Sequence, residues 1–474
     1  MESVLSLLER YCGNYIPMCM PGHKRNLSLP HAEYLSHLAA GIDVTECAGL
    51  DNLNSPAGIF LESERTAASL WGARRSIYLV NGSTGGILAA VYAMAGAGDE
   101  VICARACHRS VYSALEITGA VPAFVDSLPD GSVSAGAVEK ALQNHPRARL
   151  VIITSPTYDG VICDVEKIAD VCRLFGARLF VDEAHGAHFG LCGGIFGKSA
   201  ISLGADVSVD SLHKTLPSLT GTAIMHIGEG AGAELSARLE AAAAMFMTSS
   251  PSYILSSSID GCVRLLSEHG SEIIPAWHAL CEKFYERCDS LSAVRLLPPD
   301  GRDISKLVFD TSGTDMTGAD FAALLREKYH IEPEAASPDT VLAMTGAGDT
   351  EKTLEALLFA VSEIDAAAAP RAGGARFPKN PPTPKRAVLA SDIKKSGAPY
   401  EAVALTRACG RVSGEYIWAY PPGVPIIIPG EIFDDEIISF INETTAKKIE
   451  LFSNFGGLIS PSATVSCIKS DFFA

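Results

Sequence analysis

The chain has 474 residues, 47% of them hydrophobic and 20% charged, and its formal net charge is −17. This length exceeds what one hydrophobic core normally serves, so we expect two or three folded domains, and the apolar content argues against a disordered chain. The acidic balance disfavours nucleic acid as a partner, because phosphate backbones would be repelled.

The first residues predict an amphipathic helix, since Leu5, Leu8 and Tyr11 recur at helical spacing. The segment from Pro17 to Arg25 contains glycine and proline and is expected to end this helix. We therefore assign residues 1–61 to an N-terminal arm.

From Ser76 onward, short apolar strands alternate with helices. We expect strands at residues 76–80, 100–104, 150–154, 178–182, 206–210 and 222–226, and helices at 86–94, 110–117 and 165–174. This alternation is typical of a parallel or mixed sheet with helices on both faces, and ligands of such sheets bind at the carboxyl ends of the strands. The predicted large α/β domain covers residues 62–290 and includes a long helical region at 234–286.

A smaller α/β domain is predicted at residues 291–366, followed by a linker and a small C-terminal domain. Its strands are expected at 306–309 and 340–344 and its helices at 318–327 and 353–364. Residues 367–386 are rich in Ala, Gly and Pro, as linkers often are. Residues 387–474 contain the turn Tyr420-Pro421-Pro422-Gly423 and form the C-terminal domain.

The 13 cysteines are scattered and show no zinc-type spacing, so we expect reduced thiols and no metal site. The N-terminus lacks the basic and long apolar segments of a signal peptide, and the longest apolar stretch, near residues 87–97, is too short to span a bilayer. These features predict a cytoplasmic protein with no membrane partner.

Two groups of reactive side chains end predicted buried strands. Asp182 opens the run Asp182-Glu183-Ala184-His185, and Lys214 closes the run Ser211-Leu212-His213-Lys214. A carboxylate at a strand end can keep a pyridinium nitrogen protonated, and a lysine whose pKa is lowered by its surroundings can form a Schiff base with an aldehyde. Alone, such an Asp is usually a turn former and such a Lys a solvated residue. The ordered pair, with a histidine beside each, is far more specific.

The turn Asn81-Gly82-Ser83-Thr84-Gly85-Gly86 lies between a predicted strand and an apolar helix. Its glycines allow close backbone approach, the helix start favours an anion, and Ser83 and Thr84 add hydroxyls, so it predicts a phosphate site. It matches neither nucleotide-binding fingerprint, and alone it would equally be a capped turn. His108, after the next strand, can stack on an aromatic ring, although alone it would be an ordinary histidine at a helix start.

Taken in order, these residues resemble the Orn/Lys/Arg decarboxylase family of fold-type I enzymes that depend on pyridoxal 5'-phosphate (PLP), in its short form without an N-terminal wing domain. The resemblance covers most of the chain. It is carried by Met20-Pro21-Gly22-His23-Lys24, Asp43-Val44-Thr45-Glu46, Gly49-Leu50-Asp51-Asn52-Leu53, Asn81-Gly82-Ser83-Thr84, Asp182-Glu183-Ala184-His185-Gly186, Ser211-Leu212-His213-Lys214, Ser250-Pro251-Ser252-Tyr253, Ile331-Glu332-Pro333-Glu334, Tyr420-Pro421-Pro422-Gly423 and Pro429-Gly430-Glu431.

The resemblance implies an aspartate-aminotransferase-like large domain and a role for each matching residue. Lys214 would carry PLP, Asp182 would pair with the pyridinium nitrogen, His108 would stack on the ring and His185 would sit near the phenolic oxygen. Glu334 would face the cationic tail of the substrate. The remaining cofactor-binding residues would be Ser83, Thr84, Gly85, Ala184, Ser211 and His213, with Thr248 or Ser249 reaching the phosphate of a partner subunit. A homodimer or a larger even oligomer is therefore expected.

The implied function is decarboxylation of a basic L-amino acid, with arginine as the first choice, agmatine as its product and polyamine biosynthesis as the setting. Lysine and ornithine remain alternatives, because side-chain length is read by pocket depth. Another fold-type I reaction, transamination or elimination, is a further alternative. A transaminase would need an Arg for the substrate carboxylate, for which Arg302 is the nearest candidate, although it equally suits an ordinary loop. A binding protein that had lost the chemistry is least favoured, since Lys214 and Asp182 are both present.

Overall fold

The computed structural model describes residues 2–14, 24–25, 27, 36–370, 381–420, 423–455 and 457–469. The chain forms two compact units. The first comprises Met1–Met94, Phe180–Ala276 and Gly346–Gly348, and the second comprises Ala95–Leu179, Trp277–Thr345 and Asp349–Ala474. Most of the first motif that carries the resemblance, residues 20–23, lies outside the described residues, as do residues 371–380 of the predicted linker and residues 421–422.

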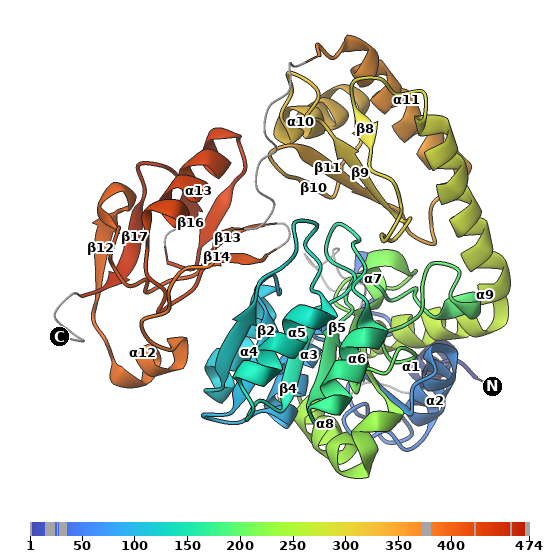
Figure 1. The fold of residues 1–474 in the computed structure, drawn as a ribbon. Coiled ribbons are helices and arrows are strands. Elements are labelled where there is room, and N and C mark those ends of the chain that lie inside the picture. Colours follow the sequence, from blue (N-terminus) through green and yellow to red (C-terminus); the bar gives the residue numbers. More distant parts are fainter. Residues whose placement is uncertain are drawn as a thin grey trace. The chain divides into compact units, whose positions relative to one another are not determined.

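The first unit is built on four strands, of which Figure 1 labels β5. These strands lie in the order β1-β7-β6-β5, with β5 and β6 parallel and β7 antiparallel to both of its neighbours. Nearly all of their residues are buried, as expected for a sheet that helices cover on both faces. The mixed sheet agrees with the predicted α/β class. Their bounds are Arg75–Leu79 for β1, Arg178–Asp182 for β5, Val207–Ser211 for β6 and Ala223–Ile227 for β7.

The helices of the first unit include α3 (Gly82–Met94), which packs against α8 and against strands β6 and β7. Gly86 permits this approach, because a Cβ there would lie 2.5 Å from Leu79 Cδ1 and 2.9 Å from Val209 Cγ1. The predicted helical region at 234–286 is divided into two helices. The other helices are α1 (Val4–Asn14), α2 (Ile59–Trp71), α7 (Leu212–Thr215), α8 (Gly232–Phe246) and α9 (Tyr253–Cys288), of which α9 continues into the second unit.

The N-terminal helix α1 is present, but its buried face differs from the prediction. Val4 and Leu8 are buried, whereas Leu5 is 43% exposed. The Val4 N–H donates to the Asp260 carboxylate (2.9 Å), which fixes the start of the helix and turns Val4 inward in place of Leu5.

The second unit contains parallel strands in the order β4-β2-β3, together with two further groups of strands. The parallel strands are β2 (Glu100–Ala104), β3 (Val121–Val125) and β4 (Leu150–Thr154), and the helices that follow them in the chain are α4 (Arg109–Thr118), α5 (Ala135–Asn144) and α6 (Val165–Leu174). His108 is the last of the four residues that join β2 to α4, so it lies in the loop after the carboxyl end of the strand.

A small antiparallel sheet in the order β10-β11-β9-β8 follows, and its core is formed by Phe309, Phe321, Leu325, Val341 and Val361. Its strands are β8 (Arg295–Leu296), β9 (Lys306–Asp310), β10 (Ala335–Ala336) and β11 (Thr340–Met344), and its helices are α10 (Gly318–Tyr329) and α11 (Glu351–Ala367). Strands β9 and β11 and helices α10 and α11 overlap the elements expected here, and the domain bounds 291–366 stay a prediction.

The C-terminal part has its own core around Ile427, Phe433, Ile437 and Leu451. Its strands lie in the orders β12-β17 and β14-β13-β15-β16. The elements are α12 (Ala390–Ser396), β12 (Tyr400–Ala404), β13 (Ile417–Ala419), β14 (Pro425–Ile427), α13 (Asp435–Ala446), β15 (Leu451–Ser453), β16 (Gly457–Ile459) and β17 (Thr464–Ile468). Among the described residues of the whole chain, no helix combines the length and apolar character needed to cross a membrane.

Candidate active site

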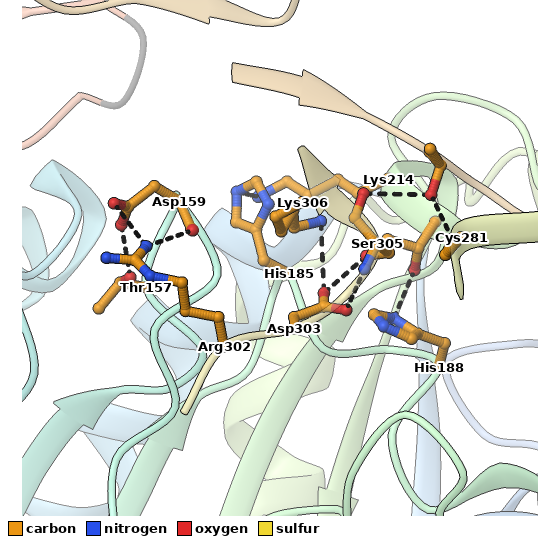
Figure 2. Close-up of polar contacts among 12 residues, drawn as sticks. Thr157, Asp159, His185, His188, Lys214, Cys281, Arg302, Asp303, Ser305 and Lys306 are labelled. Carbon is orange, nitrogen blue, oxygen red and sulfur yellow. Dashed lines mark hydrogen bonds and ion pairs between the residues drawn. The ribbon is translucent and has the colours of Figure 1, made fainter. Parts of the chain in front are cut away.

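Lys214 lies in the short helix α7 directly after β6, and His185 lies in the turn that follows β5. The Nζ of Lys214 is 2.9 Å from Nε2 of His185. Figure 2 draws both side chains. Two nitrogens at this distance share one proton, with either the ammonium donating to a neutral imidazole or the imidazole donating to a neutral amine. The arrangement therefore provides a route for a proton to or from the lysine nitrogen.

Asp182, the last residue of β5, is 3% exposed, and its Oδ1 accepts a hydrogen bond from the Ala184 N–H (3.2 Å). Burial raises the pKa of Asp182, while the charge of Lys214 and the Ala184 N–H act in the opposite direction. A buried carboxylate with an elevated pKa is short of compensating positive charge. A protonated ring nitrogen placed beside it would supply that charge.

Ser211 and His213 flank the start of α7. The Oγ of Ser211 is buried and has no hydrogen-bond partner among the residues that the structure describes, so a ligand oxygen there would satisfy it. Nδ1 of His213 lies 3.0 Å from the Thr222 carbonyl oxygen and must donate to it, which leaves Nε2 for a second contact. Burial lowers the pKa of His213.

The predicted phosphate turn forms the start of α3, where the helix dipole and the first N–H groups favour an anion. Gly82 opens the helix with a φ of 74°, and its N–H donates to the Gly221 carbonyl oxygen (2.8 Å). A Cβ at Gly85 would collide with the Asn81 side chain, which is held by a hydrogen bond from its Nδ2 to the Phe246 carbonyl oxygen (2.8 Å). Ser83 and Thr84 lie in the first turn of this helix.

The other predicted residues of the first unit differ in burial. Ala184 is buried beside Asp182, whereas Thr248 and Ser249 are exposed after α8. The Thr248 carbonyl oxygen accepts a hydrogen bond from Asn54 Nδ2 (3.2 Å). The role of Thr248 and Ser249 toward a partner subunit stays a prediction.

The second unit contains His108 and Glu334. His108 is the N-cap of α4, and its Nδ1 accepts a hydrogen bond from the Ser110 N–H (3.2 Å). Glu334 is exposed and accepts a short hydrogen bond from the Tyr158 hydroxyl. Of the predicted site residues, the structure places Lys214, His185 and Asp182 in one group, which belongs to the first unit.

Arg302, the candidate for a carboxylate-binding arginine, is paired within the second unit. Its Nη1 lies 3.3 Å from Asp159 Oδ2 and also donates to the Asp159 carbonyl oxygen (3.2 Å). These contacts are drawn in Figure 2. They match the interpretation of Arg302 as a structural loop residue.

Lys306 was missed by the sequence analysis. Its side chain is fully buried, its Nζ lies 3.8 Å from Asp303 Oδ2, and it has no hydrogen-bond partner among the described residues (Figure 2). Burial lowers the pKa of Lys306, and the charges of Asp303 and Glu334 oppose that shift. Gly160, at a φ of 90°, packs on it so closely that a Cβ would lie 2.7 Å from Lys306 Cγ. The only sequence signal was a lysine opening an otherwise apolar strand.

Comparison with known proteins assigns the chain to a family. The model of the Orn/Lys/Arg decarboxylase major domain matches residues 7–333, and the model of the C-terminal domain of the same family matches residues 376–455. The chain belongs to the Orn/Lys/Arg decarboxylase family. Members of this family are PLP-dependent decarboxylases, so the predicted enzyme class and the predicted fold are confirmed.

Individual relatives agree with this membership. The arginine decarboxylase of Halalkalibacterium halodurans is 30% identical over 91% of this chain and 90% of its own length. That of Bacillus subtilis is 29% identical over 89% of each chain. The solved structure of Francisella novicida lysine decarboxylase LdcF shares the fold, with a TM-score of 0.82 at 15% identity over 98% of this chain and 81% of that one.

Within the described residues, no group of three or more His, Cys, Asp or Glu side chains is placed to hold a metal ion.

Proposed function

We propose that this decarboxylase acts on L-arginine, releasing CO₂ and agmatine, with PLP bound to Lys214. The observation that carries the proposal is the pairing of Lys214 Nζ with His185 Nε2 at 2.9 Å, in a group that also contains the buried Asp182. The arginine decarboxylases that match along nearly the whole chain support the choice of substrate.

The residues present fit PLP at both ends of that molecule. A buried carboxylate with an elevated pKa matches a protonated ring nitrogen. A phosphate suits the start of α3, which packs against β6, and Ser211 at the end of β6 has a buried hydroxyl with no hydrogen-bond partner among the described residues. When bound, PLP supplies an electron sink for the pair left behind as the bond to the carboxylate breaks. The residues proposed to hold it are Ser83, Thr84, Gly85, His108, Asp182, Ala184, His185, Ser211, His213 and Lys214, with Thr248 and Ser249 serving a partner subunit.

Each group near the reacting atoms has a separate task in this proposal. Asp182 keeps the proton on the ring nitrogen, which it can do because its own charge is otherwise poorly compensated. His185 accepts the proton that Lys214 must lose before its nitrogen can react, and returns a proton when product leaves. His108 stacks on the ring and fixes its plane.

Glu334 is the proposed partner of the substrate's cationic tail. A guanidinium or ammonium group enclosed by protein needs a carboxylate, because a buried unpaired charge is costly. The Tyr158 hydroxyl donates to one Glu334 oxygen and leaves the carboxylate oriented, with a second oxygen for the substrate. Arginine would use that oxygen most fully, since its guanidinium offers a planar set of donors.

Assembly and setting complete the proposal. The exposed Thr248 and Ser249 are proposed to complete the phosphate site of a neighbouring subunit, which requires a homodimer or a larger even oligomer. We place the enzyme in the cytoplasm and its product among the precursors of polyamines, in keeping with the scattered cysteines and the acidic composition.

A substrate panel tests the assignment. Purified enzyme loaded with PLP is incubated with L-arginine, L-lysine and L-ornithine, and both CO₂ and the amine product are measured. We expect arginine to give the highest kcat/KM. A preference for lysine or ornithine would overturn the arginine assignment alone. Consumption of the amino acid without CO₂ release, or transfer of its amino group to a keto acid, would overturn decarboxylation itself.

A further inference from the structure

The C-terminal part of the chain is anchored to the strand–helix segment that bears His108, and both belong to the second unit. Arg105, only 4% exposed, lies 3.2 Å from Glu431 Oε2 through Nη2 and donates from the same nitrogen to the Ile426 carbonyl oxygen (3.1 Å). The Tyr416 hydroxyl donates to Glu116 on α4 (2.8 Å). A buried ion pair with supporting hydrogen bonds tolerates little displacement, so this anchoring fixes the two segments relative to each other.

The anchoring places Gly423 against the ring of His108. The Arg109 N–H donates to the Gly423 carbonyl oxygen (3.0 Å), and the Arg109 guanidinium lies over the Trp418 ring, 5.0 Å from its centroid. A Cβ built on Gly423 would lie 3.0 Å from both Cδ2 and Nε2 of His108. The next nearest atom belongs to Tyr420, at 3.5 Å, so the Cδ2–Nε2 bond is the part of the imidazole nearest to Gly423.

The opposite edge of the ring is also held. Nδ1 accepts the Ser110 N–H (3.2 Å) and lies 2.7 Å from Ser110 Oγ. A neutral His108 that accepts at Nδ1 carries its proton on Nε2, the nitrogen that faces Gly423. The two contacts hold the imidazole from both ends and so restrict its orientation, which a residue that stacks on a flat ligand requires.

We propose that the C-terminal domain, through Gly423, is the positioning element that sets the ring plane of His108 for stacking on the cofactor. This inference rests on the proposed function, in which His108 stacks on PLP. Gly423 is a positioning residue, since it acts only through the imidazole. Its φ of 78° and the lack of space for a Cβ both call for glycine at this position.

The chain offers a matched control. Gly410, in the same C-terminal domain, has a φ of 79°, and a Cβ on it would meet nothing within 4 Å. Gly423→Ala and Gly410→Ala therefore carry the same backbone strain, and only the first presses on His108. Each is compared with wild type in three measurements: the imidazole resonances of His108 in the PLP-free protein, the dissociation constant for PLP, and the visible circular dichroism of the bound cofactor.

We expect Gly423→Ala to shift the His108 resonances, to weaken PLP binding by about 3- to 10-fold, the scale of one disturbed aromatic contact, and to change the visible circular dichroism. Gly410→Ala should match wild type in all three. Equal behaviour of the two variants would overturn the inference. The variant His108→Ala tests the proposed function separately. If this variant binds PLP as tightly as wild type, the stacking role of His108 is wrong, and this conclusion does not depend on the resonances of Gly423→Ala.

A second variant covers the case in which Gly423→Ala does not fold. Arg109→Ala removes the contact with Trp418 but keeps the backbone N–H that binds Gly423 and adds no strain at a glycine. We expect the same changes at His108 to a smaller extent. Resonances and PLP affinity identical to wild type in this variant would count against positioning by the C-terminal domain.

Discussion

Replacing Asp182 by asparagine keeps the size of a buried side chain and removes its charge. In the proposed function this charge is the only carboxylate that holds the ring nitrogen of PLP protonated. Removing one partner of a buried charged pair costs about 3–5 kcal/mol, and each factor of ten in rate corresponds to about 1.4 kcal/mol. We therefore expect kcat to fall by roughly 10²- to 10⁴-fold, with PLP still bound to Lys214.

The same substitution should have the opposite effect on the stability of the PLP-free protein. Burial raises the pKa of Asp182 above its ordinary value of 3.8. Between that value and the raised one, the folded protein binds more protons than the unfolded chain, so the free energy of unfolding decreases as the pH rises through this interval. Above it, the cost of the buried anion is fully present. Asparagine escapes this cost, so the variant should be at least as stable as wild type at neutral pH, with the difference shrinking as the pH falls through the interval.

Asp210→Asn is the matched control, because Asp210 is fully buried on the neighbouring strand β6. Burial raises the pKa of Asp210 well above its ordinary value, and an asparagine side chain is nearly isosteric with the carboxyl group. Its kcat should stay within about tenfold of wild type. CO₂ release gives kcat, absorbance gives the PLP content and calorimetry gives the melting temperature without PLP. Near-normal turnover of Asp182→Asn, or an equal loss in Asp210→Asn, would refute this reasoning.

Four further outcomes are expected. Lys214→Ala should lose bound PLP and activity while remaining folded, and borohydride reduction of wild type followed by peptide mapping should label Lys214; a label on Lys306 would contradict the assignment. Glu334→Gln should lose about 2–5 kcal/mol in kcat/KM for arginine at unchanged PLP content, and Tyr158→Phe should lose less; equal kcat/KM values would remove Glu334 from the site. Lys306→Met should destabilise the fold by about 3 kcal/mol in urea, and adding Asp303→Asn should recover part of that; no recovery would contradict a coupled pair. Sedimentation should show a dimer or larger even oligomer, and a fully active monomer would be incompatible with shared sites.

The strands that sequence analysis placed to the residue are the ones with uninterrupted apolar runs. The expected bounds 100–104, 150–154, 178–182 and 340–344 coincide with β2, β4, β5 and β11. Strand β3 was missed because Pro122 interrupts its apolar pattern, and a proline within a run argues against a central strand. The start of α3 was placed at 86 and lies at Gly82, because the run from Gly82 to Gly86 has no helical periodicity of its own and is held by packing on α8.

In the candidate site, too, residues marked by a local sequence pattern could be predicted, and residues defined by contacts between distant segments could not. Asp182 and Lys214 could be proposed because each ends a recognisable strand, and the order of the motifs supplied the family. Lys306 could not be proposed from the sequence. The charges that oppose the lowering of its pKa include that of Glu334, which comes near Lys306 only in the folded chain. The contact of Gly423 with His108 was equally invisible, because it joins a turn of the C-terminal domain to a helix start some 300 residues earlier.

Strand β3 ends the order β4-β2-β3, so within the second unit one of its long sides faces no neighbouring strand among the described residues. The Arg386 guanidinium lies there and donates to the Pro122 carbonyl oxygen (2.8 Å). An uncovered strand edge is a template for pairing with another chain. A truncation between residues 371 and 380 would remove Arg386 and Glu431. It would uncover this edge and leave Arg105 buried without its carboxylate partner. We therefore expect the shortened protein to aggregate during expression. On this reasoning the C-terminal domain keeps the enzyme from aggregating, in addition to its part in the enzyme.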